Sequence, residues 1–434
     1  TTRYFVSRVL EHWLVNYKID GFRFDLSKGF TQTQTCDGTG NNCDVNGWSA
    51  YDASRIAIWK RYYDTLQLKS SGCYAILEHF ADNNEEKELS NYGLMLWGNE
   101  NYHYSQAAQG WASSADFSSG IYNSGIRGWS NPHLVTYMES HDEERIMYNN
   151  LTNGNSSGGY NVRSLNTALK RMELAGAFFF PLPGPKMLWQ FGELGYDYSI
   201  NYCQDGTINS NCRLDSKPIR WDYKNVAERN SVYNTWSALA KLRKSPTHSS
   251  LFTSANAGWN FSNYFKWYRC TQGNAQIVVV GNFDVAQQTG SVDFPAIAGG
   301  ASNWYNYLTQ TAVPTSTIST GAHTQSFTLQ PGEFFVYTNG FVPIPVTIIN
   351  FTGRGRGTSN QLTWKVAQEQ NMRSYDVERS TDGINFTRIG SVSPTGNSDY
   401  SYVDDVSGLH ASTYYYRLRS VDLDGDFRFS TIVR

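Results

Sequence analysis

Three acidic residues, Asp25, Glu78 and Asp142, each stand at or near the end of a short apolar run. Each run reads as a buried strand, and a parallel α/β barrel brings the side chains at its strand ends to one face. A single carboxylate in such a place is often the cap of the following helix. Three in this order, with Arg23 two residues before Asp25 and His141 next to Asp142, favour a shared site instead. The runs are Asp20-Gly-Phe-Arg-Phe-Asp25, Ala75-Ile-Leu-Glu-His79 and Tyr137-Met-Glu-Ser-His-Asp142.

These residue types suit the cleavage of a glycosidic bond with retention of configuration. Such chemistry places two carboxyl groups about 5 Å apart, one that attacks the anomeric carbon and one that protonates the departing oxygen and later deprotonates water. Arg23 favours an ionised Asp25, whereas the apolar and aromatic neighbours at 76–80 favour a protonated Glu78. Asp142 can hydrogen-bond sugar hydroxyls more strongly as the transition state develops, and only such differential binding speeds the chemical step.

The order and neighbours of these residues resemble the α-amylase family of retaining α-glucan hydrolases and transglycosylases. The resemblance implies that Asp25 is the nucleophile, Glu78 the general acid/base and Asp142 the residue that stabilises the transition state. It also implies that Arg23 keeps the nucleophile ionised and that His141 binds the sugar. The fold it implies is a (β/α)8 barrel with the active site at the carboxyl ends of the strands.

Two later segments extend the resemblance, which covers roughly residues 1 to 340. One is similar to the eighth strand of the family barrel and the loop after it, and the other to the segment before the last barrel helix. They are Gly184-Pro-Lys-Met-Leu-Trp-Gln-Phe-Gly-Glu193 and Lys217-Pro-Ile-Arg-Trp-Asp222.

The chain departs from the family pattern at two places. Where the family usually has Lys-His shortly after the nucleophile, this chain has Lys28-Gly29, and Lys28 is expected to keep its contact with the sugar. Residues 3–18 already read as the helix before the fourth strand. The first three strands are therefore expected on a missing N-terminal barrel segment, either in the same polypeptide or in a nicked fragment.

The composition excludes some classes of partner but does not by itself indicate a function. Lys and Arg total 36 against 38 Asp and Glu, a formal charge of −2, so neither nucleic acid nor an anionic membrane is indicated as a partner. No run approaches the roughly 18 apolar residues of a membrane span. Aromatic residues make up 15% of the chain. Most of these residues are expected to belong to a large core. Exposed rings near the strand ends could instead stack on sugar faces, namely Trp48, Tyr51, Trp97, Tyr102 and Trp129.

Six cysteines suggest two local disulfides, Cys36 with Cys43 and Cys203 with Cys212, each across a loop that has little core of its own. Cys73 and Cys270 lie in apolar contexts and are expected to be buried thiols. This usage favours an oxidising, extracellular location.

No cofactor is required for the predicted chemistry, and no cysteine spacing indicates a metal site. The loop 37–44 allows a structural calcium ion. The acidic run 422–426 reads as a hairpin turn rather than as calcium ligands.

The order of strand-like and helical runs divides the chain into four parts. Strand-like runs at 19–25, 74–78, 134–138 and 186–191 alternate with helical ones at 3–18, 51–69, 163–177 and 229–244. Residues 1–246 are therefore predicted to be the C-terminal part of a barrel, about its strands 4 to 8. Residues 247–340 are predicted to be an antiparallel β-domain, with strands at 275–283 and 332–337.

The Pro-containing segment 341–346 is predicted to be a linker, and 347–434 a separate β-sandwich. Its strands are expected at 360–365, 374–380 and 413–420, with hairpin turns at Asp382-Gly383 and Asp424-Gly425. This part resembles the fibronectin type III-like modules that precede the sorting signal of proteins exported by the type IX system of bacteria. A generic spacer or sugar-binding sandwich is the alternative.

The sequence thus predicts a secreted α-amylase that cleaves α-1,4-glucosidic bonds of starch or glycogen. A debranching or branching enzyme of the same family is the first alternative, because the three carboxylates do not separate these activities. A glycan-binding or adhesion protein that kept the barrel and lost turnover is the second. The intact set of Asp25, Glu78, Asp142 and Arg23 argues against it.

Overall fold

The structure is a computed structural model that describes residues 2–37, 39, 41, 43–343, 347–367, 369, 372–423, 425 and 427–434. The chain divides into two compact units, Thr1–Gly340 and Phe341–Arg434. The expected barrel part and the expected β-domain at 247–340 therefore lie in one unit. Residues 344–346 of the expected linker are outside the described residues. None of the helices in the described ranges has the length and apolar character needed to cross a membrane.

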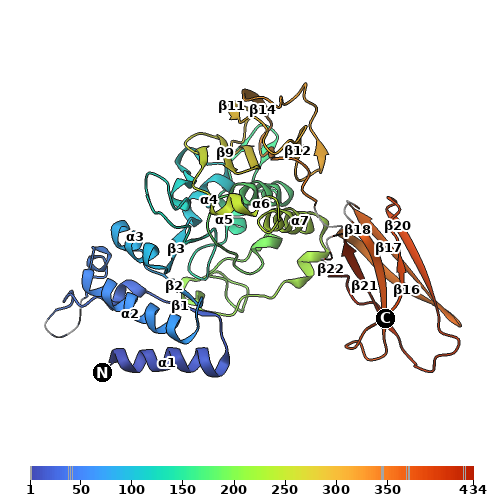
Figure 1. The fold of residues 1–434 in the computed structure, drawn as a ribbon, viewed down its shortest axis with the longest axis horizontal. Helices are drawn as coiled ribbons and strands as arrows, with labels where there is room; N and C mark the ends of the chain where they lie inside the picture. The colour runs from blue at the N-terminus through green and yellow to red at the C-terminus, as the bar shows by residue number, and fades with distance from the viewer. Residues whose placement is uncertain are drawn as a thin grey trace. The chain divides into compact units, whose positions relative to one another are not determined.

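An open parallel sheet of five strands forms the centre of the first unit (Figure 1). Its strands follow one another in chain order, and helices separate them, as parallel connections require. They are β1 (Gly21–Phe24), β2 (Tyr74–Leu77), β3 (Met95–Asn99), β4 (Leu134–Tyr137) and β7 (Lys186–Met187). The predicted α/β class of this part is confirmed.

The helices pack in order along the chain, α1 on α2, α2 on α3, α4 on α5 and α6, and α6 on α7. Their apolar faces cover the sheet, where Trp59, Leu77 and Leu96 belong to one buried cluster. All four predicted helices are present within two residues of their expected ends. The helices are α1 (Thr2–Tyr17), α2 (Ala53–Lys69), α3 (Asn83–Tyr92), α4 (Asn101–Gln109), α5 (Ile146–Asn153), α6 (Leu165–Phe179) and α7 (Ala227–Leu242).

Two strands differ from the prediction. β3 was not expected, because its five residues include Gly98 and Asn99, which weaken a strand signal. Gly98 is needed there, since a Cβ at this position would lie 2.9 Å from Leu134 Cδ1. The predicted strand at 186–191 ends at Met187, because the chain leaves the sheet and reaches Phe191 with a φ of 44°.

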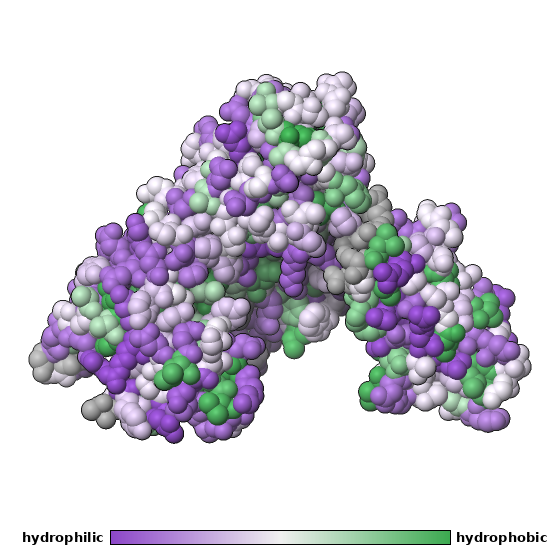
Figure 2. Space-filling view, viewed as in Figure 1, coloured by the Kyte–Doolittle hydropathy of each residue, from purple (hydrophilic) through white to green (hydrophobic). Residues whose placement is uncertain are grey.

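Helix α1 leaves many of its apolar side chains in solvent. Tyr4, Phe5, Val9, Trp13 and Val15 are all exposed, whereas Leu10 and Leu14 face the core. Figure 2 shows hydrophobic side chains at the surface in this region. The helix therefore presents apolar side chains on two sides, only one of which is packed.

The second half of this unit is antiparallel. A six-stranded sheet has the order β13-β12-β15-β10-β9-β8, and β11 pairs with β14. Strands β10 and β15 match the two predicted here. The strands are β8 (Ala257–Asn260), β9 (Phe265–Gln272), β10 (Ala275–Asn282), β11 (Gln288–Phe294), β12 (Trp304–Asn306), β13 (Thr311–Ala312), β14 (His323–Leu329) and β15 (Phe334–Asn339).

A buried arginine ties this β-region to the helices. Arg171 of α6 donates to the carbonyls of Ala107 and Ala108 in α4 and to those of Phe283 and Asp284 after β10. A guanidinium has five donors in a fixed plane, so it can satisfy carbonyls from several elements at once. This network explains why residues 247–340 and the helical part form one compact unit.

The second unit consists of two antiparallel sheets with the orders β16-β17-β20 and β19-β18-β21-β22. Both sheets contribute to one buried cluster that includes Leu362, Trp364, Tyr375 and Leu418. The predicted strands are confirmed, and so is the turn at Asp382-Gly383, whereas Asp424 lies outside the described residues. The strands are β16 (Thr347–Arg356), β17 (Ser359–Ala367), β18 (Met372–Ser380), β19 (Thr387–Val392), β20 (Asp399–Asp405), β21 (Tyr415–Asp422) and β22 (Phe427–Phe429).

Candidate active site

The register of β1 and β2 brings Asp25 and Glu78 together. Phe24 pairs with Leu77, so the next residue of each strand stands at the same edge of the sheet. The N–H of Glu78 donates to the carbonyl of Phe24 at 3.0 Å and extends this pairing by one step. At the other end of β1, Gly21 allows the close approach, since a Cβ there would lie 2.3 Å from the carbonyl oxygen of Tyr74. The strand-end prediction for these two carboxylates is confirmed.

Arg23 lies between the two carboxyl groups. Its Nη1 donates to Asp25 Oδ1 at 2.5 Å, and its Nη2 is 2.8 Å from Glu78 Oε2. The guanidinium also lies over the ring of Trp97, 4.1 Å from the ring centroid. The contact with Asp25 was predicted, but those with Glu78 and Trp97 were not, because Trp97 belongs to the strand that the sequence did not reveal.

The two carboxyl groups have different environments. The side chain of Asp25 is 73% exposed, whereas that of Glu78 is 14% exposed. The hydrogen bond from Arg23 lowers the pKa of Asp25 below its usual value. Burial raises the pKa of Glu78, and the opposing effects of the Leu26 N–H and Arg23 are smaller. Between these two pKa values Asp25 is ionised and Glu78 carries a proton, which is the division of labour that a retaining mechanism needs.

The backbone after Asp25 is shaped to hold Glu78. Leu26 has a φ of 42°, in the left-handed region that residues with a Cβ rarely adopt. In this conformation its N–H donates to Glu78 Oε2 at 2.8 Å. Ser27 adds two bonds, since its N–H and its Oγ both donate to the carbonyl of Glu78. The loop after β1 therefore fixes both the backbone and one carboxyl oxygen of Glu78.

A buried ionic cluster supports these loops from behind. Arg55 of α2 forms a two-pronged contact with Glu85, at 2.6 Å and 2.7 Å, and Glu85 Oε1 is 2.8 Å from Nε2 of His79. The other ring nitrogen of His79 is 2.8 Å from Ser27 Oγ. The residues after β1 and β2 are thus joined to the N-terminus of α3 through side chains that have almost no exposure.

Asp142 and His141 follow β4 at the same edge of the sheet. Nε2 of His141 is 3.2 Å from Asp142 Oδ2, and both side chains are less than half exposed. His141 helps to lower the pKa of Asp25. The pKa of Tyr137, the last residue of β4, is raised by burial and then by the charges of Glu143, Glu78 and Asp142. Trp97 links the two positions, since its ring centroid lies 6.2 Å from that of His141 and 4.1 Å from the Arg23 guanidinium. The gathering of Asp142 with the first two carboxylates stays a prediction.

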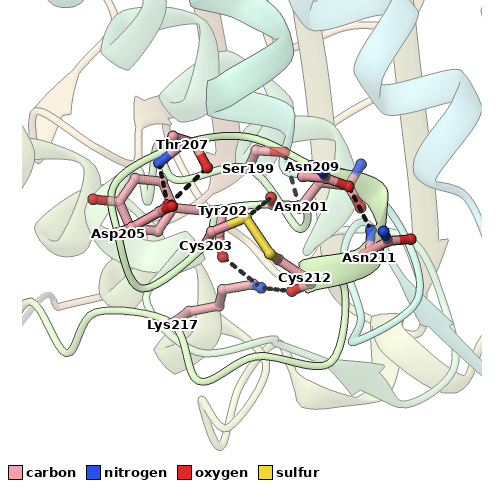
Figure 3. The surroundings of a disulfide bond; sticks show 10 residues. All are labelled: Ser199, Asn201, Tyr202, Cys203, Asp205, Thr207, Asn209, Asn211, Cys212 and Lys217. Carbon is pink, nitrogen blue, oxygen red and sulfur yellow. Dashed lines mark hydrogen bonds between the residues drawn. A yellow bond between two sulfur atoms is a disulfide. The ribbon is translucent and has the colours of Figure 1, made fainter.

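Arg213 is a site residue that the sequence did not reveal. Its Nη2 donates to Asp142 Oδ1 at 3.1 Å and to the carbonyl of Asp142 at 2.6 Å. It follows the Cys203–Cys212 disulfide, whose loop is drawn in Figure 3. Lys217 closes this loop by donating to the carbonyls of Tyr202 and Cys212. No local pattern signals the contact, because 71 residues separate Arg213 from Asp142.

A cavity of about 440 Å³ opens beside Asp142. His141 and Arg213 line it, together with Trp189, Tyr196 and Trp221. Asp25 and Glu78 are not among its lining residues, so the acid pair lies outside this cavity. An extended ligand at this face would contact aromatic rings, His141 and Arg213 in the cavity.

The other residues singled out in the sequence have mixed outcomes. Lys28 donates to Ser49 Oγ at 3.1 Å in the loop after β1, so its contact with sugar remains a prediction. The expectation of exposed rings is wrong for Trp97 and Trp129, which are buried. Trp97 packs against Tyr137 at the site, and the ring of Trp129 donates to Asn83 at the start of α3.

Both predicted disulfides are present, and Cys73 and Cys270 are buried thiols. Within the described ranges, no three His, Cys, Asp or Glu residues gather as metal ligands. The loop 37–44 includes three residues outside the description, as the run 422–426 includes two. Structural calcium therefore stays a prediction.

Solved structures share the fold of the first unit. The structure called AmyP in complex with maltose matches with a TM-score of 0.53 and 16% identity over 78% of this chain and 68% of that one. Trehalose-6-phosphate hydrolase from Bacillus licheniformis matches with a TM-score of 0.53 and 14% identity over 77% and 68%. An Anoxybacillus α-amylase matches with a TM-score of 0.47 and 14% identity over 77% of this chain and 62% of its own length.

At these identities the likeness concerns the fold alone. The chain spans less than two thirds of the length of the Anoxybacillus enzyme. No protein-family model matches the chain, and no curated protein matches it in sequence. The first unit therefore shares its fold with AmyP and with the trehalose-6-phosphate hydrolase.

Proposed function

We propose that this protein is a retaining glycoside hydrolase that cleaves α-1,4-glucosidic bonds of starch-like or glycogen-like α-glucans. One observation carries the proposal: Asp25 and Glu78 stand on adjacent strand ends, share Arg23, and have pKa values shifted in opposite directions. Asp25 acts as the nucleophile and Glu78 as the general acid/base. Asp142 stabilises the transition state, and His141 and Lys28 bind the sugar.

The mechanism follows from the two protonation states. Ionised Asp25 attacks the anomeric carbon while Glu78 gives its proton to the departing glycosidic oxygen, which leaves a glycosyl ester on Asp25. Glu78, now ionised, takes a proton from water, and this water displaces Asp25 with a second inversion. Arg23 keeps Asp25 ionised before attack and stabilises it again as the ester breaks.

The α-1,4 specificity depends on features other than the fold. AmyP with maltose and the trehalose-6-phosphate hydrolase have the same TM-score against this chain, so the fold does not separate substrates. A debranching or branching enzyme would use the same three carboxylates. The aromatic lining of the cavity beside Asp142 supports binding of an extended sugar chain on this face, because pyranose rings stack on aromatic faces.

The proposal includes a partner segment for the sheet. In the described part of the chain, β1 pairs only with β2 and β7 only with β4, so both edges of the parallel sheet are open. Such edges and the apolar outer side of α1 are surfaces that proteins cover. We place further barrel strands there, from the same polypeptide or from a nicked fragment.

The two disulfides support an extracellular location, since such bonds persist in oxidising compartments. The two antiparallel sheets of the second unit support a fibronectin type III-like module. We also propose that the protein is exported by the type IX system.

The test is the anomer formed first. The intact protein is mixed with a soluble α-1,4-glucan, and the anomeric protons are followed by NMR during the first minutes. We expect the α-anomer to appear before mutarotation, because attack by Asp25 gives overall retention. Early β-anomer would contradict a nucleophilic Asp25, and no reducing ends at all would contradict the activity.

A further inference from the structure

A second groove lies between α4 and α5, which are neighbours in Figure 1. It is an open groove with a volume of about 540 Å³, and none of its lining residues belongs to the acid pair or to the cavity beside Asp142. Its walls consist of amide, hydroxyl and aromatic side chains, including Asn101, Tyr102, Gln106, Trp111, Asn149 and Asn153.

No charged side chain lines this groove within the described residues. None of its residues is ionised at neutral pH, so nothing here would pair with a phosphate, a carboxylate or an ammonium group. Side-chain amides offer two donors and an acceptor, which matches neighbouring hydroxyl groups. Aromatic faces offer apolar contact to the carbon-bound hydrogens of a ring. A neutral polyhydroxylated ligand is the class that fits both features.

Two aromatic residues of the groove stand at opposite ends of α4. The side chain of Tyr102 is 60% exposed at the start of α4, and that of Trp111 is 42% exposed just after its end. The helix between them rises roughly 13 Å, at about 1.5 Å per residue. The spacing of the rings suits a chain of linked sugars better than a single one.

The groove is formed before any ligand binds. The indole N–H of Trp111 donates to the carbonyl of Asn153 at 3.0 Å, which fixes the ring between the two helices. Asn149 donates to Ser105 Oγ at 3.0 Å, and this joins α5 to α4 at the floor. Binding to a preformed surface loses less conformational entropy.

The side-chain amide of Gln106 in the groove is available to a ligand. The side chain of Gln106 makes no hydrogen bond within the described residues, although it stands between Tyr102 and Trp111 along the chain. An amide that is half-buried and unengaged can bond a ligand without first breaking an internal contact.

We propose that the groove between α4 and α5 is a second glycan-binding site, which holds a neutral polysaccharide chain apart from the acid pair. That the polysaccharide is an α-glucan rests on the proposed function. The site would keep the protein on a polymer between cleavage events at Asp25 and Glu78. Its lining distinguishes it from the cavity beside Asp142, which contains His141 and Arg213.

The test measures binding separately from turnover. Variants are made in the intact protein that carries Glu78→Gln, so that the polymer is not consumed, and retardation is measured in native gels with increasing soluble starch. Tyr102→Ala and Trp111→Ala are each expected to raise the dissociation constant about tenfold, equivalent to ~1.4 kcal/mol. Gln106→Ala should raise it by a smaller factor.

Tyr74→Ala is the matched control, since this tyrosine is 54% exposed at the start of β2, outside the groove. It should be retarded like the parent. Tyr102→Ala also controls for folding, because within the described part of the chain Tyr102 makes no side-chain hydrogen bond that its loss would break. In the Glu78 background, unchanged retardation of both Tyr102→Ala and Trp111→Ala would overturn the proposal.

The remaining outcomes separate this proposal from the proposed function. If the protein hydrolyses no α-glucan but still binds starch through Trp111, the activity is wrong and the groove stands. If hydrolysis proceeds and neither Tyr102→Ala nor Trp111→Ala weakens starch binding, the groove proposal alone fails. Retention by immobilised unfolded casein that depends on Trp111, with none on starch, would make this a polypeptide site and overturn the proposal.

Discussion

The acid pair and the Asp142 region lie at the same sheet edge but are built differently. Asp25 and Glu78 are held by the pairing of β1 with β2, by Arg23 two residues away, and by the N–H of Leu26. Asp142 is held by Arg213, which directly follows a disulfide-closed loop and lies 71 residues later in the chain. The proposed nucleophile and acid/base thus depend on strand register, whereas the proposed transition-state stabiliser depends on a loop. We expect changes to the first region to affect turnover far more than changes to the second.

The largest effect should come from Asp25→Asn. The amide cannot form the glycosyl ester, so kcat on a soluble α-glucan should fall on the order of 10⁴-fold. The side chain is largely exposed, and exposed ion pairs contribute only about 0–1 kcal/mol, so the thermal midpoint should barely change. Retained hydrolysis by a correctly folded variant would remove Asp25 from its role.

Glu78→Gln should rank next and should depend on the leaving group. Loss of general acid catalysis should cost about 10³-fold on a glucan, whose leaving group needs a proton. On an aryl glycoside with an acidic phenol the first step should largely recover, because that leaving group needs none. Steady-state rates on the two substrates, measured side by side, give the comparison. An equal loss on both would contradict the assignment.

Arg23→Gln should move the pH dependence. The rate needs ionised Asp25, which requires a pH above its pKa, and protonated Glu78, which requires a pH below its own. Arg23 lowers the pKa of both groups, so its removal should shift both limbs of the kcat/KM profile to higher pH. Arg23→Lys keeps the charge and should shift them less. Limbs that do not move would exclude this electrostatic role.

Arg213→Ala tests the loop-built region. Its pair with Asp142 is about half exposed, and such pairs contribute about 0–1 kcal/mol, so kcat/KM should fall at most about fivefold. The loss should appear mainly as a higher KM, because the acid pair keeps its contacts. A loss as large as that of Asp25→Asn would show that the two regions are not separable in this way.

The smallest effect should come from removing the disulfide between Cys203 and Cys212. The double change Cys203→Ser with Cys212→Ser should lower kcat/KM about twofold. This is less than the loss expected for Arg213→Ala, whose ion pair contributes about 0–1 kcal/mol. The effect is small because Lys217 still donates to the carbonyls of Tyr202 and Cys212 at the two ends of the loop. Cys36→Ser with Cys43→Ser is the matched control, since that bridge closes a loop that does not carry Arg213. Kinetics on a short oligosaccharide and thermal unfolding are measured for both. A greater loss in the control would refute the loop's special role.

The same contrast explains how far the sequence could predict this protein. Asp25, Arg23 and Glu78 were found because an apolar run followed by a carboxylate is a local pattern that parallel strands translate directly into position. Arg213 could not be found, because its approach to Asp142 depends on the path of a loop. β3 was missed because Gly98, required by a close contact with Leu134, makes the strand signal weak. Because β3 was not predicted, the position of Trp97 and its contact with the Arg23 guanidinium were not predicted either.

The rings around His141 have a consequence for spectroscopy. Its imidazole lies between two indoles, with centroids 6.2 Å from Trp97 and 5.8 Å from Trp189, and the guanidinium of Arg23 covers Trp97. The emission of an indole depends on the polar groups and the water around it. A bound saccharide that orders His141 or excludes water from these rings should therefore change the intrinsic fluorescence of the protein. Ligand binding at this site would then be measurable by intrinsic fluorescence, without a label and without turnover.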